Sequence, residues 1–268
     1  MPNPTPPVTV VIPARFGSSR FPGKPLALLA GKPIIQHVYE RAQAAGVHRV
    51  LVATDDVRIQ KAVTAFGGTV VMPEGRFRTG TDRVAAVARQ TPGDVFVNLQ
   101  GDEIALHPGL LTDLIRPFLE SGADMGTLKR ALTSSKEVTN PGIVKVVTNP
   151  DGEALYFSRA PIPCDREKGP GKFVAGLHYV HLGIYIYTRE TLLRISTLPT
   201  SPLEEAEKLE QLRALEHGIR IRVWETGLQS LRIDTPKDLR EAESALKRMT
   251  RQRTSVRSAA RTTARGAR

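Results

Sequence analysis

The sequence has a single cysteine, no apolar run long enough to cross a membrane and no internal repeat. Cys164 cannot form an internal disulfide, and no cluster of cysteine and histidine suggests zinc, so we expect Cys164 to pack rather than to act as a nucleophile. A bilayer span needs about 20 apolar residues, so no membrane span is expected. The start, MPNPTPPVTV, lacks the basic and apolar regions of a signal peptide, which favours a cytoplasmic protein.

The chain also lacks acidic residues after Glu243, and this absence explains most of its net charge of +11. Eight lysines and arginines follow that residue, and no aromatic residue lies among the arginines after Met249. A polar, basic segment with nothing to bury is expected to be disordered, so residues 249–268 are predicted to be a disordered basic tail. Without aromatic side chains for base stacking, a solvated extension with weak polyanion contact is the favoured interpretation.

The rest of the chain has the composition of one α/β domain, which we place at residues 8–248 after a flexible N-terminus at residues 1–7. Forty per cent of the 268 residues are apolar, enough to bury one sizeable core. Strand and helix patterns alternate as in a parallel sheet. The expected strands are residues 8–14, 49–56, 69–72 and 94–103, and the expected helices are residues 33–46, 57–68, 83–90 and 110–122.

Beyond Asp124 the pattern changes toward antiparallel pairing. Residues 143–159 form two β-rich runs joined by Asn-Pro-Asp-Gly, which is typical of a turn. A Ser-x-x-Glu capping box at Ser201 predicts one helix over residues 201–218. The remaining expected elements are a mobile loop at 161–173, strands at 178–187 and 219–225, and a helix at 234–249 capped by Thr235.

The first strand runs directly into a loop rich in cations and small residues, VTVVIPARFGSSRFPGKPL. In an open α/β sheet, ligands bind at the carboxyl ends of the strands. Glycine and serine, here including Ser19, let backbone N–H groups approach phosphate oxygens, while Arg15, Arg20 and Lys24 can neutralise their charge. The loop fits neither the Walker pattern nor the dinucleotide fingerprint. It predicts a polyphosphate site, and a solvated turn with scattered cations is the weaker alternative.

Further motifs follow this loop through most of the chain. IPARFGSSRFPGKPL and GKPIIQHVYERA precede, in order, VATDD, TGTDR, VNLQGDE, VKVV, ALYFSRAPIP, HLGIYIY, SPLEEAEKLEQLR and IDTPKDL. From Val10 to about Leu239 the sequence therefore resembles the 3-deoxy-manno-octulosonate cytidylyltransferase (CMP-Kdo synthetase) family of sugar nucleotidyltransferases. It departs from that family at residues 77–79, where His-Gln-Ser is common, and at Ile104, where proline is usual.

The resemblance implies both a fold and a reaction. The fold is a Rossmann-like, GT-A-like three-layer α/β sandwich with a mainly parallel mixed sheet and a small antiparallel subdomain for sugar binding and dimerisation. The reaction transfers CMP from CTP to 3-deoxy-D-manno-octulosonate (Kdo), an acidic eight-carbon sugar, and releases pyrophosphate for lipopolysaccharide biosynthesis. A homodimer and Mg²⁺ are implied as well.

The resemblance also assigns residues to the nucleotide and the metal. Residues 78–83 would surround the cytosine and ribose. A carboxylate such as Asp102, at a strand end, can hold Mg²⁺ against phosphate oxygens. Asp234 is the second ligand that the resemblance implies, although by itself it suits a turn before a helix. The implied catalytic residues are Lys24, Arg15, Asp102 and Asp234, the nucleotide-binding residues are Arg15, Ser19, Arg20, Lys24, Arg78, Gly80, Thr81 and Asp102, and the metal ligands are Asp102 and Asp234.

For the sugar, the resemblance implies a set drawn from several motifs. Arg159 follows a predicted strand, and its guanidinium could bind the sugar carboxylate through two parallel hydrogen bonds. His181 suits a sugar ligand, a base or a structural residue, and these alternatives stay open. The implied sugar-binding residues are Gln100, Arg159, His181, Tyr185, Glu210 and Gln211.

Two other functions compete with this one. A related CTP-dependent transferase could use another acidic sugar, such as 8-amino-Kdo or sialic acid, with the same fold and chemistry. A nucleic-acid-binding module carried by the basic tail belongs to another class, and salt-dependent RNA retention that is lost with the tail would support it. The tail explains none of the ordered motifs, which favours the enzyme.

The predicted tail can be tested by truncation. A chain that ends near Met249 is expected to keep its fold and its turnover, because the removed residues are polar and lack a core-forming pattern. Circular dichroism and turnover of the shortened and full-length proteins check this. Unfolding of the shortened protein would show that the segment belongs to the domain.

Overall fold

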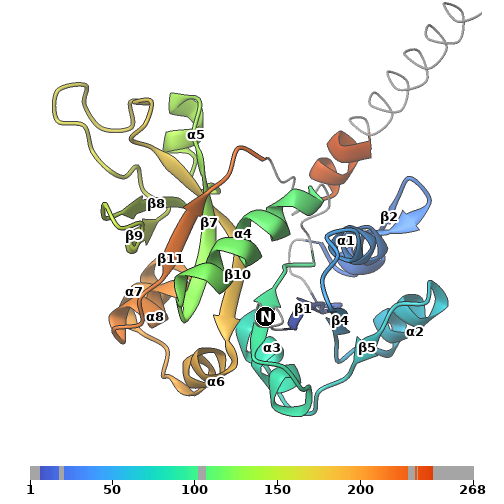
Figure 1. The fold of residues 1–268 in the computed structure, drawn as a ribbon. Helices are drawn as coiled ribbons and strands as arrows, with labels where there is room; N and C mark the ends of the chain where they lie inside the picture. Colours follow the sequence, from blue (N-terminus) through green and yellow to red (C-terminus); the bar gives the residue numbers. More distant parts are fainter. Residues whose placement is uncertain (1–6, 18–20, 102–106, 229–232, 234, 244–268) are drawn as a thin grey trace, which may run out of the picture.

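One mixed sheet runs through the molecule in the order β11-β7-β10-β6-β1-β4-β5, and β8 and β9 extend it beside β10 (Figure 1). The computed structural model describes residues 7–17, 21–101, 107–228, 233 and 235–243. The strands of the sheet are β1 (Val8–Pro13), β4 (Arg49–Ala53), β5 (Val70–Val71), β6 (Val95–Asn98), β7 (Met125–Ala131), β8 (Lys145–Thr148), β9 (Ala154–Ser158), β10 (Tyr179–Thr188) and β11 (Arg222–Glu225). A separate short pair is formed by β2 (Leu28–Leu29) and β3 (Lys32–Pro33).

Helices cover both faces of this sheet (Figure 1). They are η1 (Lys24–Leu26), α1 (Ile34–Gln43), α2 (Val57–Ala65), α3 (Gly80–Gln90), α4 (Pro108–Ser121), α5 (Ser135–Thr139), α6 (Arg189–Thr197), α7 (Pro202–Glu207) and α8 (Gln211–Glu216). Residues 236–243 are also helical, and the predicted cap is confirmed, since the Asp238 N–H donates to Thr235 Oγ1 at 3.3 Å. Among the described residues, no helix is long and apolar enough to cross a membrane.

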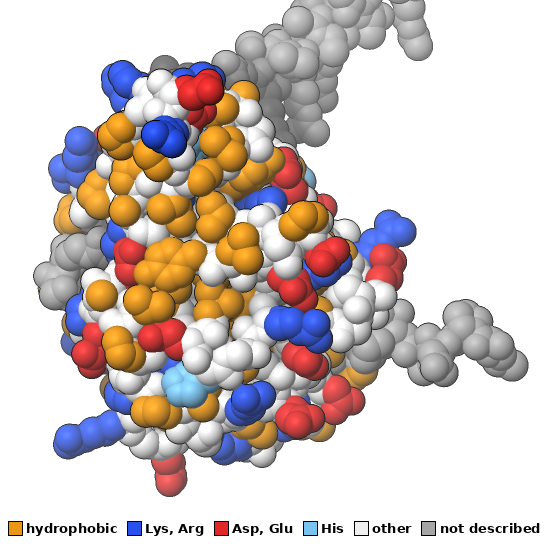
Figure 2. Space-filling view, turned by 90° about the vertical axis from the view of Figure 1, so that its left-hand side faces the viewer, with side chains coloured by type: hydrophobic (Ala, Val, Ile, Leu, Met, Phe, Trp, Pro, Cys, Tyr) orange, Lys and Arg blue, Asp and Glu red, His pale blue; other side chains and the backbone are white. Residues whose placement is uncertain are grey.

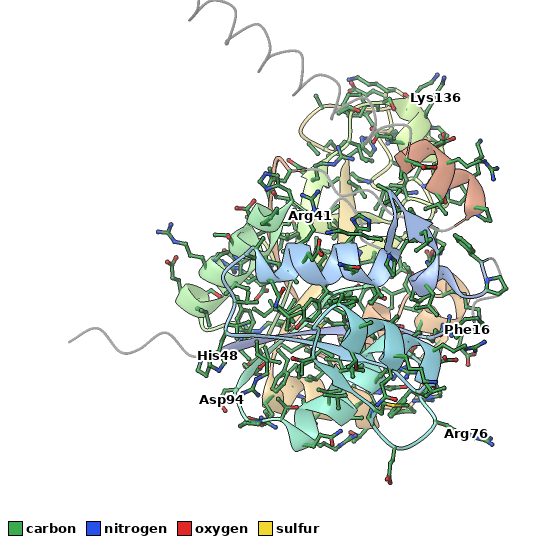
Figure 3. The ribbon with its side chains drawn as sticks, turned by 90° about the vertical axis from the view of Figure 1, so that its right-hand side faces the viewer. Phe16, Arg41, His48, Arg76, Asp94 and Lys136 are labelled. Carbon is green, nitrogen blue, oxygen red and sulfur yellow. The ribbon has the colours of Figure 1, made fainter. Side chains whose placement is uncertain are left out.

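The strand directions confirm a mainly parallel mixed sheet. β1 is parallel to β4 and β6, β4 is parallel to β5, and β7 is parallel to β11. β10 is antiparallel to β6, β7 and β8. Figure 3 shows the resulting polarity, because Phe16, just after β1, lies at the opposite end from His48 and Asp94, which precede β4 and β6. The cation-rich loop therefore begins at the carboxyl edge of the parallel strands.

Alternation along β1 explains the three layers. Val10 and Ile12 pack in a core cluster with residues of α1, α2 and α4, whereas Val11 packs in a second cluster with residues of α3, α6 and α8. Successive side chains of a strand point to opposite faces, so a strand covered on both sides is apolar throughout. The three-layer α/β sandwich predicted from the sequence is confirmed.

The predicted antiparallel pair is also present. β8 and β9 are joined through residues 149–153, where the Asn149 side chain accepts the Glu153 N–H at 2.8 Å and Gly152 has a φ of 79°. That left-handed conformation favours glycine, as the turn pattern predicted. β8 also pairs with β10, so this subdomain continues the main sheet.

Several features differ from the predictions. The single helix over residues 201–218 is wrong, because Lys208 has a φ of 53° and separates α7 from α8. Cys164 is exposed, so its predicted packing role is wrong too. β7 and α6 were not predicted. β7 carries glycine, threonine and lysine between its apolar residues, which obscures the two-residue period of a strand.

Close packing over β7 gives a stability prediction. A Cβ added at Gly126 would lie 2.9 Å from Cη2 of Trp224 and 3.1 Å from Cγ2 of Ile186, and the Trp224 ring is itself packed edge-on against Phe118. Gly126→Ala is therefore expected to lower the free energy of unfolding by about 1–3 kcal/mol, as overpacked cores do. Urea unfolding measures the change. Gly183→Ala on β10, with no neighbouring atom within 4 Å, is the control, and equal losses in the two variants would contradict the packing argument.

Candidate active site

A cleft opens at the carboxyl end of β1, where ligands of open α/β sheets bind. Its open space is about 530 Å³, including the part continuous with solvent. Four segments far apart in the sequence form its walls: the end of β1, the loop and first turn of α3, the residues after β6, and the start of α8. The lining residues are Pro13, Ala14, Arg15, Phe77, Arg78, Thr79, Gly80, Arg83, Gln100 and Glu210.

The cleft unites residues predicted for two different substrates. Arg15, Arg78 and Gly80 were predicted to bind the nucleotide, whereas Gln100 and Glu210 were predicted to bind the sugar, and all five line the cleft. The described part of the chain thus places a cationic wall opposite a carboxylate. Four further predicted residues lie outside the described residues: Ser19, Arg20, Asp102 and Asp234.

The first turn of α3 forms one wall and is fixed by its own cap. Thr79 Oγ1 accepts the Asp82 N–H at 3.1 Å, and the Asp82 carboxylate accepts the Thr79 N–H at 3.2 Å. A Cβ at Gly80 would lie 3.4 Å from Cγ of Pro13 and 3.5 Å from Nε2 of Gln100, so the helix start sits close to the end of β1. The N-terminal end of a helix carries partial positive charge, which suits an anionic ligand.

A chain of hydrogen bonds connects this wall to α8. Thr81 Oγ1 donates to the Glu210 carboxylate at 2.8 Å, Asn98 Nδ2 donates to Thr81 Oγ1 at 3.3 Å, and Gln100 Nε2 donates to Asn98 Oδ1 at 3.3 Å. Burial raises the pKa of Glu210, and the hydrogen bond from Thr81 opposes this change. This half-buried carboxylate at the cleft therefore depends on its hydrogen-bond partners.

Arg83 lies deeper in the same wall. Its side chain is 7% exposed, and Nη2 donates to Asp55 Oδ2 at 2.9 Å, which lowers the pKa of Asp55. The guanidinium carbon lies 5.1 Å from the centre of the Phe77 ring. Nη1 is buried with no hydrogen-bond partner among the described residues. This arrangement leaves a donor unused in a wall of the cleft.

Two more predicted sugar residues line a smaller inner cavity. Tyr185 and Gln211 face it together with Thr81 and Arg213, and Glu210 borders both this cavity and the cleft. The Gln211 amide nitrogen is buried without a hydrogen-bond partner in the described part of the chain. The predicted sugar residues thus extend inward from the cleft.

The other predicted residues do not line the two cavities. Lys24 is on η1. The Arg159 guanidinium donates to the carbonyls of Glu207 at 2.8 Å and Pro141 at 3.1 Å, which holds the chain where α7 ends. His181 is buried, with Nε2 3.0 Å from Thr127 Oγ1 and its ring edge-on to Phe157. Their predicted roles in binding stay predictions.

Several polar residues near the site were not predicted. Lys145 is fully buried, and its Nζ donates to the carbonyls of Asn140 at 3.0 Å and Ile143 at 2.7 Å; burial lowers the pKa of its ammonium group. The sequence signal that could have identified Lys145 as a buried polar residue is its position within the apolar run IVKVV. Glu204 and Arg213 pair with each other across the break that the sequence did not indicate.

A sheet of this topology, with a cationic cleft at the end of β1, is typical of nucleotide-binding α/β proteins. A family model described as cytidylyltransferase matches residues 9–221. The chain belongs to the cytidylyltransferase family, and within it to the 3-deoxy-manno-octulosonate cytidylyltransferases.

Similar proteins support this assignment along the whole domain. A protein of Geobacter metallireducens named 3-deoxy-manno-octulosonate cytidylyltransferase is 49% identical over 249 residues, which cover 90% of this chain and 98% of that protein. One of the same name from Syntrophotalea carbinolica is 51% identical over 247 residues, with 90% and 98% covered. A solved structure of CMP:2-keto-3-deoxy-manno-octonic acid synthetase complexed with CTP has a TM-score of 0.83 and 43% identity, and covers 91% of this chain and 99% of its own.

The raised pKa of Glu210 gives a prediction with a defined sign. Above the raised pKa, the ionised carboxylate lowers the free energy of unfolding. This loss disappears when the pH falls below the ordinary pKa of glutamate, about 4.3. Glu210→Gln is therefore expected to raise the melting temperature by a few degrees at neutral pH, to lose this advantage as the pH falls, and to lower turnover. Glu120→Gln is the control, because that carboxylate is 66% exposed. A melting temperature for Glu210→Gln below that of the wild type at neutral pH would contradict the prediction.

Proposed function

We propose that this protein transfers CMP from CTP to Kdo, giving CMP-Kdo and pyrophosphate for lipopolysaccharide biosynthesis. The observation that carries the proposal is the cleft, which is lined by Arg15, by the start of α3 and by Glu210 at the start of α8. It occurs in a chain about 49% identical to proteins named for this reaction and 43% identical to a synthetase solved with CTP.

In the proposed reaction, the anomeric hydroxyl of Kdo loses its proton to solvent and its oxygen bonds to the α-phosphorus of CTP, while the bond from that phosphorus to the bridging oxygen breaks and pyrophosphate leaves. Positioning and charge neutralisation supply most of the catalysis in such transfers. Arg15, Arg20 and Lys24 would neutralise the triphosphate, with Ser19 in the same loop. Arg78, Gly80 and Thr81 would hold the nucleoside.

The sugar would approach from the α8 side of the cleft. Glu210 and Gln100 both line the cleft. The Glu210 carboxylate can accept hydrogen bonds from sugar hydroxyls, and the Gln100 amide can both donate and accept them. Gln211 and Tyr185 would support them from the inner cavity. We assign Arg159 and His181 to the sugar as well: Arg159 makes its bonds to carbonyls with only part of its five N–H donors, which leaves others for a carboxylate.

Asp102 and Asp234 are the proposed ligands of a divalent ion, for which Mg²⁺ fits best because both offer hard oxygen donors. The described residue before each acid lies near α1. A Cβ at Gly101, which precedes Asp102, would lie 3.8 Å from Cδ1 of Ile35, and Ile233, which precedes Asp234, packs in one core cluster with Ile34. When bound, the ion would supply positive charge to the phosphate oxygens. Among the described residues, no group of three potential metal ligands forms a site by itself.

We further propose that the enzyme acts as a homodimer in the cytoplasm, where CTP is available. Figure 2 shows apolar side chains gathered on one face of the molecule, on the side where β8, β9 and α7 lie in Figure 1. Leu155 of β9 is 62% exposed and Leu203 of α7 is 39% exposed. An apolar face of this kind supports an interface between protomers.

Pyrophosphate release with each of the four nucleoside triphosphates, with Kdo or sialic acid as acceptor, tests the function. We expect release only when CTP and Kdo are both present. Equal release with sialic acid would contradict the assignment of the sugar, and release with another triphosphate in place of CTP would contradict that of the nucleotide.

The proposed metal ligands can be tested as a pair. Asp102→Asn and Asp234→Asn are each expected to suppress turnover with the fold intact, and the double variant should be little worse, because residues that act through one ion give non-additive losses. Added Mg²⁺ should partly restore the single variants, since an amide keeps an oxygen but not the charge. Circular dichroism and turnover against Mg²⁺ concentration measure this. Full activity of Asp234→Asn beside an inactive Asp102→Asn would overturn the two-carboxylate site.

A further inference from the structure

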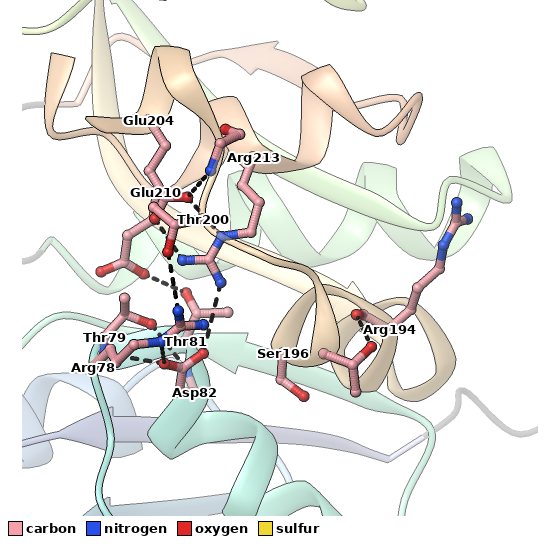
Figure 4. A network of polar contacts seen from close by, with 12 residues as sticks. Arg78, Thr79, Thr81, Asp82, Arg194, Ser196, Thr200, Glu204, Glu210 and Arg213 are labelled. Carbon is pink, nitrogen blue, oxygen red and sulfur yellow. Dashed lines mark hydrogen bonds and ion pairs between the residues drawn. The ribbon is translucent and has the colours of Figure 1, made fainter. Parts of the chain in front are cut away.

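A buried ionic cluster lies behind the cleft and reaches both of its walls. It consists of Arg213 on α8, Glu204 on α7 and Asp82 on α3, and we call it the Arg213 cluster (Figure 4). Arg213 Nε and Nη2 donate to the two Glu204 carboxylate oxygens at 2.7 and 2.5 Å, and Nη1 lies 3.9 Å from Asp82 Oδ1. The Arg213 side chain is 3% exposed and that of Glu204 is 9% exposed.

The cluster joins α3, whose first turn lines the cleft, to α7 and α8. Asp82 forms the capping box with Thr79, which lines the cleft on the nucleotide side. Glu204 accepts the Ser201 N–H at 3.3 Å and so fixes the start of α7. Glu210 lies three residues before Arg213 and receives the Thr81 hydrogen bond at 2.8 Å. Two interactions therefore connect α3 to the start of α8: the Asp82–Arg213 contact of the cluster and the Thr81–Glu210 hydrogen bond.

Stability alone is a weak explanation for this arrangement. Burying an ion pair costs desolvation free energy that often cancels the Coulomb attraction, and apolar residues of similar size are frequently as stable. Asp82 Oδ1 is buried with no hydrogen-bond partner in the described ranges, and only the long contact to Arg213 faces it. What the charges do provide is a fixed geometry, because the planar guanidinium meets the carboxylate through two parallel bonds.

We propose that Arg213 is a positioning residue, which holds Glu210 at a fixed place opposite the Thr79–Gly80 wall so that nucleotide and sugar are bound in one reactive geometry. The inference rests on the proposed function. Arg213 is absent from the residues that line the cleft, so it would act through Glu210 and not by touching the nucleotide. Misplacement of a reacting group by about 1 Å can cost roughly 100-fold in rate.

The test compares Arg213→Gln in two backgrounds, wild type and Glu210→Gln, by single-turnover pyrophosphate release with CTP and Kdo. In the wild-type background we expect a loss of roughly 100-fold in rate, with CTP affinity nearly unchanged in titrations. In the Glu210→Gln background the same substitution should cost little more, because residues that act as one unit give non-additive losses. Arg116→Gln is the control, since it also removes an ion pair, but from an exposed surface.

The outcomes separate the inference from the function on which it rests. Equal fold-losses in the two backgrounds, or a loss no larger than that of Arg116→Gln, would overturn the positioning role while leaving the function intact. A wild-type protein that releases no pyrophosphate contradicts the function, and the inference with it. If Arg213→Gln does not fold by circular dichroism, Arg213→Lys is taken through the same comparison, since it keeps the charge and loses the two-bond geometry.

Discussion

The half-buried Glu210 carboxylate is the constraint on which the site depends. A charged group removed from water must be hydrogen-bonded, and Thr81 supplies that bond from the first turn of α3. Glu210 can meet Thr81 only if α8 packs on the same face of the sheet as α3, and the core cluster that contains Val84 and Leu212 shows that it does. The apolar packing of one layer thus brings the nucleotide side and the sugar side of the cleft together.

The break at Lys208 serves the same geometry. A continuous helix would carry Glu210 and Arg213 on in the direction of α7, whereas the left-handed residue turns the chain so that α8 lies beside α3. The break is held from β9, because Arg159 donates to the Glu207 carbonyl and Ser158 Oγ donates to the Glu207 carboxylate. Lys145 donates in turn to the Arg159 carbonyl. Lys145 of the VKVV motif, and Ser158 and Arg159 of the ALYFSR motif, therefore support this turn.

Sequence reasoning succeeded where the signal was local. The apolar run of β1, the Asn149–Gly152 turn and the cap at Thr235 each depend on neighbouring residues, and the structure confirms them. It failed where distant residues decide. β7 becomes a strand because β10 and β11 pair with its two edges, and Lys208 adopts its left-handed conformation against its own intrinsic preference. The family motifs assigned Arg15, Gln100 and Glu210 to the substrates, and all three line one cleft. The Arg213 cluster was not predicted, because Arg213 and Glu204 lie on opposite sides of the unpredicted break at Lys208.

The central claim is that the two walls of the cleft form one unit, and hydrogen exchange on the full-length protein tests it most directly. Exchange is measured by mass spectrometry with and without CTP and Mg²⁺, in the absence of sugar. Because local opening of linked elements is cooperative, the account predicts slower exchange both at residues 78–83 and at residues 202–216, with α2 unchanged. Slower exchange confined to residues 78–83 would show that the helices carrying Glu210 and Arg213 respond independently of the nucleotide wall, which contradicts the claim.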